Sequence, residues 1–205
     1  KVAEQLGTNV VALTINASDS SELYTYGAEK VVAVSNDSLN TFNAKGYANT
    51  IAEAVAKENA TVVIVSSSTD SKFLAPLLAG KLKAGYAPNV VAAPENTAPF
   101  TVKRSAFSNK GFAHTTINTD VKVVGVSNNS FGAKENSASA SVEAFSPSLS
   151  DADFSVKSFL FKNSDTAFAP KFEQGKRNFS FPLCFNRYGF KSSMVLFPEK
   201  TFLFR

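Results

Sequence analysis

The chain has 205 residues, which suits one domain, or one domain with an appendage, and allows a substantial hydrophobic core. Hydrophobic residues make up 44% and charged residues 19% of it, as in soluble globular proteins. The sequence has no run of about 18 apolar residues, so we expect no membrane-spanning helix. A single cysteine, Cys184, and a single histidine, His114, exclude an intrachain disulfide and argue against a zinc site.

The net charge of +4 is unevenly distributed along the chain. Residues 1–157 carry 13 basic and 14 acidic side chains, whereas residues 158–205 carry 8 and 3. Phenylalanine divides in the same way, with 8 in the longer part and 11 in the last 48 residues. One polypeptide therefore holds two compositions, and we place a boundary at residue 157.

The first hundred residues alternate strand-like and helix-like segments. Short β-branched runs predict strands at Asn9–Ile15, Lys30–Val34, Thr61–Val65 and Val90–Ala93. We expect these strands to be neighbours in one parallel sheet, since apolar runs separated by helices are typical of right-handed βαβ crossovers. The first residues, KVAEQLG, already have a helical pattern, so we interpret the start as truncated.

Three further helices are predicted between these strands. A short one is capped by Ser20 or Ser21, passes through Leu23 and Tyr26, and ends at Gly27. A longer one covers about Phe42–Glu58, with an apolar face formed by Tyr47, Ile51, Ala54 and Val55. The last covers about Lys72–Ala84, and its spacing predicts a buried stripe of Phe73, Leu74, Leu77, Leu78 and Leu82, with Gly85 as its end.

From Phe100 onward the pattern changes to strands joined by short polar turns. The predicted strands are Thr101–Phe107, Ala113–Asn118, Val121–Val126, Ser139–Phe145 and Phe154–Lys157. Because no helix separates them, we expect a β-meander that adds antiparallel members to the sheet or forms a small second sheet.

Residues 158–205 keep neither a strand period nor a helix period, and three prolines interrupt them. We expect this basic, Phe-rich tail to be disordered, or extended coil with at most one short helix or hairpin, and its deletion to leave the fold intact and improve solubility. Its composition suits a shifted reading frame in AT-rich DNA, so we interpret it as a frameshift or gene-model error. A single-strand nucleic-acid interface is disfavoured, because no motif accompanies the irregularly spaced rings.

Several stretches of residues 1–157, in order, resemble the N-terminal domain of electron transfer flavoprotein α subunits. The most specific are YGAEKV, SSTDSKFLAPLLAGKL and AFSPSLSDADF, with AEQLGTNVVALTI and FTVKRSAFSNKGFAHTTINTDVKVVGV around them. The resemblance implies a mainly parallel α/β sheet of the adenine-nucleotide-hydrolase-like, Rossmann-like kind. It also implies that the family's first strand precedes Lys1.

The same resemblance implies a function in a heterodimer that holds FAD. In the family, electrons pass from acyl-CoA dehydrogenases toward a membrane quinone reductase, in the bacterial cytoplasm or the mitochondrial matrix. This chain would supply the platform for the β subunit and would therefore expose an apolar patch. The family's flavin turn, of the type VVSGGRGL, has no match in residues 158–205, so we expect no FAD on this chain alone and no catalytic residue.

The strongest candidate for an anion site is the turn after Thr61–Val65. Ser68, Thr69 and Asp70 lie between that strand and the next helix, where backbone N–H groups can hold a phosphate. No Gly-rich loop or G-K-[ST] motif is present, so this is not a P-loop. A simpler interpretation is that Thr69 or Asp70 caps the helix.

The other polar candidates have structural explanations. His114 lies in a predicted strand without a Ser or Cys nucleophile motif, which favours a structural or surface role. Lys103 and Arg104 could face a flavin or a partner subunit, or simply solvent. Three functions remain: part of a redox heterodimer, a separate ATP- or AMP-binding module of the same fold, or a truncated inactive polypeptide.

Overall fold

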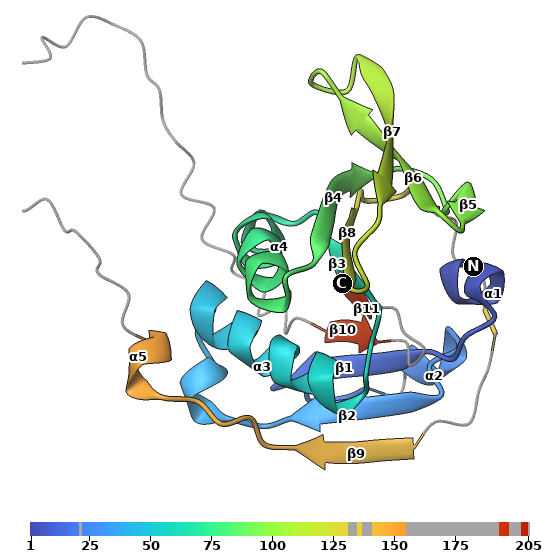
Figure 1. Cartoon of the computed structure of the whole chain (residues 1–205). Helices are drawn as coiled ribbons and strands as arrows, with labels where there is room; N and C mark the ends of the chain where they lie inside the picture. The colour runs from blue at the N-terminus through green and yellow to red at the C-terminus, as the bar shows by residue number, and fades with distance from the viewer. Residues whose placement is uncertain (21, 131–134, 137–140, 155–192, 197–201, 205) are drawn as a thin grey trace, which may run out of the picture.

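The computed structural model describes residues 1–20, 22–130, 135–136, 141–154, 193–196 and 202–204 (Figure 1). The last two segments are described as strands only. Most of the tail therefore lies outside the described residues, as do residues 155–157. Among the described residues, no helix is long and apolar enough to cross a bilayer.

The body of the fold contains two sets of parallel strands. In the first set, β2 (Lys30–Val34) pairs with β1 (Val11–Ile15) on one side and β9 (Ser141–Phe145) on the other. In the second set, β8 (Lys122–Val126) lies between β3 (Val62–Ser66) and β4 (Gly85–Val90). The predicted fold class is confirmed: mainly parallel strands flanked by helices, with antiparallel strands added.

Helices cover both faces of these strands. The two long ones, α3 (Ala44–Lys57) and α4 (Thr69–Leu82), pack together on one face. The short helices are α1 (Val2–Leu6), α2 (Glu22–Thr25), the 3-10 turn η1 (Asp37–Leu39) and α5 (Asp151–Phe154). The start of α3 is fixed by Asn43, whose side chain accepts hydrogen bonds from the backbone N–H groups of Lys45 and Gly46.

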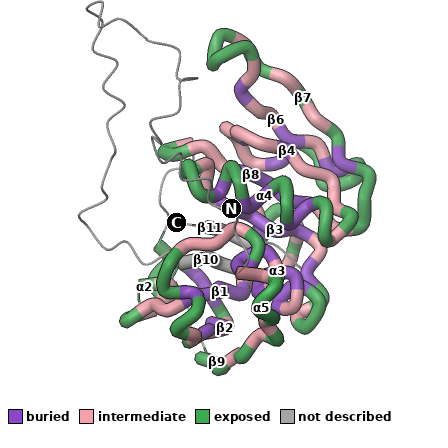
Figure 2. Tube along the Cα trace, turned by 90° about the vertical axis from the view of Figure 1, so that its left-hand side faces the viewer, coloured by how far each residue is buried: buried purple, intermediate pink, exposed green. Residues whose placement is uncertain are grey.

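Two apolar cores lie on opposite faces of the strands, and much of the strand backbone between them is buried (Figure 2). Leu13 of β1 and Val63 of β3 point into the core under α3 and α4, with Ile51 and Leu78. A neighbour of each of these strand residues, Ala12 in β1 and Ile64 in β3, points into the core on the α1 side. The alternation is that of strands buried on both faces. Both cores take residues from β1 and β3, which makes the two strand sets one packed unit.

The expectation of a single sheet with four neighbouring strands is wrong, because β1 and β3 do not pair. The edge of β1 that faces β3 pairs with β10 (Ser193–Leu196), antiparallel, in the register Val11↔Leu196 to Thr14↔Ser193. β10 pairs in turn with β11 (Phe202–Phe204), which lies beside β3. The described part of the tail is thus a pair of antiparallel strands between the two strand sets, and the prediction for the rest of the tail falls outside the described residues.

The predicted β-meander is only partly correct. β6 (Phe100–Ala106) and β7 (Gly111–Ile117) form an antiparallel hairpin, which we call the arm, with the two-residue strand β5 (Asn96–Thr97) at its base. The arm stands away from the body (Figure 1). The next two predicted strands, however, pair in parallel within the body as β8 and β9. Each of them follows a connection that returns the chain to the starting end of the sheet.

Three further predictions are corrected. In α4 the buried face contains Leu74, Ala75 and Leu78, whereas Phe73 and Leu77 are 65% and 48% exposed. The helix stops at Leu82 because Lys83 is left-handed (φ 51), and Gly85 instead begins β4.

The third correction concerns Phe154, which was predicted to begin a strand. It ends α5 and packs against the core with Leu149. Ser150 begins this turn by donating hydrogen bonds from its N–H and its hydroxyl to the Asp153 carboxylate. A carboxylate three residues ahead that closes on the backbone favours a helical turn over a strand.

Deleting residues 193–205 tests whether the tail hairpin supports the sheet. We expect the amides of β1, Val11–Thr14, to exchange faster with deuterium in the deleted chain, because the deletion leaves one edge of β1 unpaired. The amides of β8 are the internal control, since β8 keeps both of its neighbours. Unchanged protection of β1 would instead support the sequence-based expectation that the fold does not depend on the tail.

Candidate functional site

The turn after β3 is a helix cap rather than an open anion site. The Ser68 Oγ accepts a hydrogen bond from the Ser71 N–H (3.2 Å), so Ser68 is the N-cap of α4. The prediction that Thr69 or Asp70 caps the helix is therefore wrong. The three serine hydroxyls bond one another, with the Ser71 Oγ 2.8 Å from the Ser68 Oγ and 3.1 Å from the Ser66 Oγ.

This arrangement leaves little for an anion to bind. Thr69 and Asp70 are exposed in the first turn of α4, and the Asp70 carboxylate adds a negative charge near the start of the helix, which disfavours a second anion there. The candidate residues Ser68, Thr69 and Asp70 are thus adjacent but do not converge on a cavity. Their binding of an anion remains an untested prediction.

The arm brings together the other polar residues that the sequence singled out. Its outer face carries Lys103 opposite His114, and Ser105 opposite Phe112. The Lys103 Nζ lies 4.6 Å from the centroid of the Phe112 ring, a cation–π contact. His114 Nδ1 is 2.6 Å from the Glu95 Oε2, so it joins the arm to the segment before β5. This contact is that of a structural residue rather than of a general base beside a nucleophile.

Arg104 lies on the opposite face of the arm from Lys103. Its Nε donates to the Thr115 Oγ1 (2.9 Å), and its backbone pairs with Val90 at the end of β4. Further down the same face, Phe100, Val102 and Ile117 are buried in the core on the α1 side. Arg104 therefore stabilises the pairing within the arm, while Lys103 lies on the outer face beside the exposed Phe112 ring.

The tip of the arm is the most exposed apolar feature among the described residues. Phe107 is 84% exposed, and Phe112, on the other side of the hairpin turn, is 63% exposed. Ser108 and Asn109 both have positive φ, and the Lys110 N–H donates to the Phe107 carbonyl (3.1 Å), the pattern of the tight turns that suit hairpins. Phe107 itself has φ 51, which is unfavourable for a bulky side chain.

A charge cluster at the starting end of β2 has a structural role. The Lys30 Nζ lies 2.7 Å from the Glu58 Oε1 and 2.6 Å from the Glu143 Oε2, and Lys57 also binds Glu143. Hydrogen bonds from Lys30 and Lys57 lower the pKa of Glu143 to about 2. The cluster joins α3, β2 and β9. No sequence pattern reveals it, because its members are distant along the chain.

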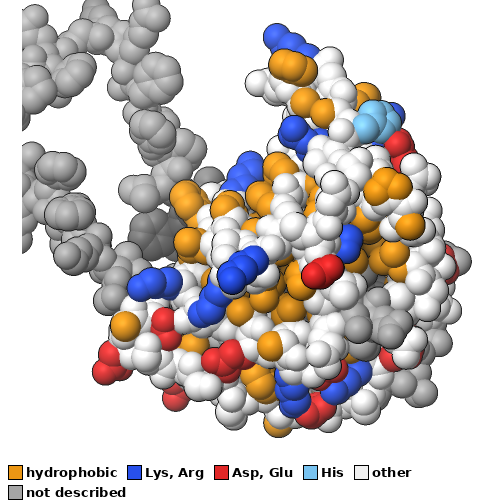
Figure 3. Space-filling model, viewed as in Figure 1, with side chains coloured by type: hydrophobic (Ala, Val, Ile, Leu, Met, Phe, Trp, Pro, Cys, Tyr) orange, Lys and Arg blue, Asp and Glu red, His pale blue; other side chains and the backbone are white. Residues whose placement is uncertain are grey.

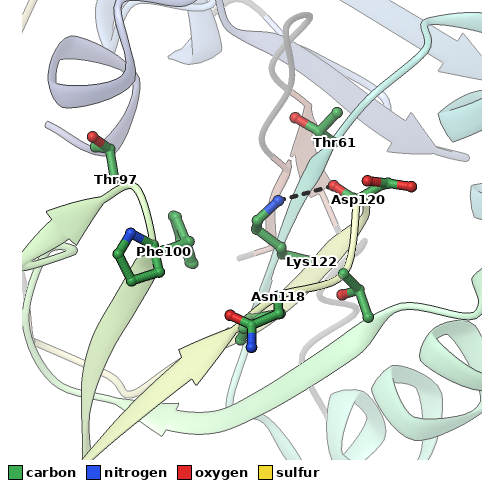
Figure 4. A pocket seen from close by; sticks show the side chains of 9 residues that line it. Thr61, Thr97, Phe100, Asn118, Asp120 and Lys122 are labelled. Atoms are coloured by element: carbon green, nitrogen blue, oxygen red, sulfur yellow. Dashed lines mark hydrogen bonds between the residues drawn. The ribbon is translucent and has the colours of Figure 1, made fainter.

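A cavity lies at the opposite end of the strands from Ser68. It has a volume of about 470 Å³ and is open to solvent at the base of the arm, beside Lys122 and Thr61 (Figure 4). Nothing in the sequence pattern pointed to it, since its walls come from three separate segments. Among the described residues, no group of three His, Cys, Asp or Glu side chains could hold a metal ion.

Comparison with known proteins gives consistent matches. A family model described as the electron transfer flavoprotein domain matches residues 1–150. The electron transfer flavoprotein subunit alpha of Bacillus subtilis is 27% identical over 163 residues, which cover 78% of this chain and 48% of that protein. The subunit of the same name from Thermoanaerobacterium thermosaccharolyticum is 32% identical over 88 residues, covering 42% of this chain and 27% of that protein. The chain thus spans about half the length of the first relative and about a quarter of the second.

The Ser68 cap can be tested by a pair of alanine variants. Ser68→Ala removes the acceptor for the Ser71 N–H and should lower the free energy of unfolding by about 0.5–2 kcal/mol, the usual cost of a lost N-cap. Thr69→Ala, one residue further on, should stay within about 0.5 kcal/mol of the parent chain. Urea denaturation followed by circular dichroism measures both. A larger loss for Thr69→Ala would restore the sequence-based assignment of the cap.

Proposed function

The chain belongs to the electron transfer flavoprotein domain family, and we propose that it is the subunit-packing part of an electron transfer flavoprotein α subunit. Residues 1–157 would form the α-subunit N-terminal domain, and residues 158–205 a tail unrelated to the family. The observation that carries the proposal is the arm, a hairpin that stands off the body and exposes two phenylalanines at its outer end.

Exposed aromatic rings of this kind are typical of protein–protein contacts. Phe, Tyr and Trp are enriched in interfaces, where they anchor a partner by filling pockets. The exposed fractions of Phe107 and Phe112 leave most of both side chains available. The space-filling view places hydrophobic and basic side chains together at the far end of the arm (Figure 3).

The charge of the arm defines the surface that fits it. Residues 100–117 include Lys103, Arg104 and Lys110 and no aspartate or glutamate. Because complementary charge steers association and fixes register, the partner surface should be acidic around a socket for Phe107. We propose that this partner is the electron transfer flavoprotein β subunit.

The wider activity of the complete protein follows from its family. We propose that the full α subunit and the β subunit form a heterodimer that holds FAD and carries electrons from acyl-CoA dehydrogenases toward a membrane quinone reductase. This chain would contribute packing and no catalytic residue. In a bacterium such a protein works in the cytoplasm, and in a eukaryote in the mitochondrial matrix.

Flavin binding distinguishes this chain from the complete subunit. We expect the purified 205-residue chain to lack the near-ultraviolet and blue absorbance bands of a bound flavin, because none of its segments matches the family's glycine-arginine flavin turn. An absorbance scan after incubation with excess FAD and desalting measures this. Retained flavin bands would show that residues of this chain hold the cofactor.

A separate ATP- or AMP-binding module of the same fold is the alternative, with an inactive truncated polypeptide as a third possibility. The geometry at the turn after β3 favours neither nucleotide, since the serine hydroxyls are bonded to one another and Asp70 opposes a phosphate. Nucleotide titration would separate the alternatives.

The arm is tested by removing its two rings. The double variant Phe107→Ala, Phe112→Ala should weaken binding to the cognate β subunit about ten- to thirtyfold, as expected for anchors worth about 1.4–2 kcal/mol. Phe73→Ala is the matched control, because it removes an equally exposed ring from α4. Biolayer interferometry with immobilised β subunit measures all three chains.

Either of two outcomes would contradict the proposal. Weaker binding by Phe73→Ala, with the arm variant unchanged, would move the interface to α4. Failure of the parent chain to bind a β subunit that does bind the full-length α subunit would show that packing depends on other parts of the subunit.

A further inference from the structure

The cavity at the base of the arm has the chemistry of a binding site that the proposed function does not use. It opens where β3 and β8 begin, beneath the turn that leads into β6 (Figure 4). Its walls combine polar side chains with one proline ring and two buried apolar side chains. The lining residues are Thr61, Thr97, Pro99, Phe100, Ile117, Asn118, Thr119, Asp120 and Lys122.

Lys122 supplies the only positive charge among these residues, and Asp120 the only negative charge. Its Nζ donates one hydrogen bond, to the backbone carbonyl of Asp120 (2.9 Å), and lies 5.9 Å from the Phe100 ring centroid. An ammonium has three N–H donors, so two are left for a ligand. No carboxylate of the described residues lies within 4 Å of it.

Lys30 provides an internal comparison, because it also begins a central parallel strand. Burial lowers the pKa of Lys30, but hydrogen bonds and charge from Glu143 and Glu58 more than offset this and raise it. For Lys122, burial lowers the pKa and the nearby Asp120 charge does not restore it. Lys122 is therefore a partly desolvated cation that lacks carboxylate contacts like those of Lys30 with Glu58 and Glu143.

Neutral donors surround the same space. The hydroxyls of Thr61 and Thr97 and the amide of Asn118 make no hydrogen bond to any described residue. These residues come from three different segments, and Figure 4 shows Thr61 beside the end of the Lys122 side chain, with Asn118 and Thr97 elsewhere along the cavity. Hydroxyl and amide donors beside an ammonium form a set that suits the oxygens of an anion.

The walls of the cavity are held by close packing. Gly85 begins β4 directly behind Ile117, and a Cβ at position 85 would meet the Ile117 Cγ2 at 2.5 Å. The Gly85 N–H also donates to the Thr119 Oγ1 (2.8 Å), which in turn donates to the Val121 carbonyl. The polar groups are thus mounted on strand ends and tight turns, as a preformed site requires.

We propose that this cavity binds a small organic anion, whose oxyanion group is held by Lys122 with Thr61 and Asn118 and whose apolar body lies on Pro99. The volume of about 470 Å³ exceeds what a bare inorganic ion needs and lies in the range of small-molecule sites. The head group is a carboxylate or a phosphate monoester, which share the acceptor oxygens that the cavity selects. The site lies at the base of the arm, away from the exposed tip at Phe107 and from the Ser68 turn.

Isothermal titration of the full chain with phenyl phosphate, benzoate and inorganic phosphate at pH 7 and 150 mM NaCl tests the proposal. At least one of the two aromatic anions should bind at least tenfold more tightly than inorganic phosphate. Which of them binds better identifies the head group. Lys122→Met should weaken that binding tenfold or more, whereas Lys110→Met, the same change of charge at the tip of the arm, should leave it unchanged.

A second measurement needs no variant. Acetic anhydride labelling of the unmodified chain, read by peptide mass spectrometry, should modify Lys122 severalfold more slowly when the tighter aromatic anion is present, with Lys110 unaffected. Equal affinity for all three anions, equal weakening by both lysine variants, or equal labelling of Lys122 with and without the anion would each overturn the proposal.

Discussion

The arm joins the body where β4 ends, at Val90. β4 runs parallel to β8 from Gly85 to Ala87, shifts register, and pairs with β8 again at Val90. Val90 is also the residue of β4 that pairs antiparallel with β6, opposite Arg104. Asn89, just before it, has φ 53, the left-handed conformation that Asn tolerates better than most residues. This irregular strand end turns the chain out of the parallel body and sets the direction of the arm.

Packing at the base of the arm stabilises its attachment to the body. Phe100, Val102 and Ile117 are buried in the same core as Ala12 and Ile64 of the body. Burying such side chains stabilises by about 1.5–3 kcal/mol each, which is large beside the few hydrogen bonds at Val90. The base of the arm is therefore fixed while its outer end is solvated. The arm therefore presents Phe107 and Lys103 in a defined position. The solvent-open Lys122 cavity lies between the base of the arm and the strands.

Sequence patterns predicted which segments form helices and strands better than they predicted which strands pair with one another. The apolar face of α3 is as predicted, because Tyr47, Ile51, Ala54 and Val55 have helical spacing and only one side of the helix meets the strands. The face of α4 was wrong because all sides of that helix carry apolar residues, so spacing could not tell Leu74 and Leu78 from Phe73 and Leu77. Strand pairing was least predictable: β8 and β9 have the short apolar runs of hairpin strands, and only tertiary packing makes them parallel.

The candidate sites show the same limit. Lys103, Arg104 and His114 were identified along the chain, but only the pairing of β6 with β7 shows that Lys103 and His114 share the outer face and Arg104 does not. The Ser68 turn was correctly placed between a strand and a helix, while its use as a cap depends on hydrogen bonds that a sequence does not specify. The cavity could not be predicted without the fold, since Thr61, Thr97 and Lys122 are brought together from three separate segments.

Hydrogen–deuterium exchange of this chain, alone and mixed with its β subunit, tests the central claim that the arm is the packing surface. We expect slower exchange in residues 100–117, greatest around the tip at Phe107–Gly111, with the amides of α4 unchanged. Protection on α4 or at the Ser68 turn, with the arm unchanged, would contradict it.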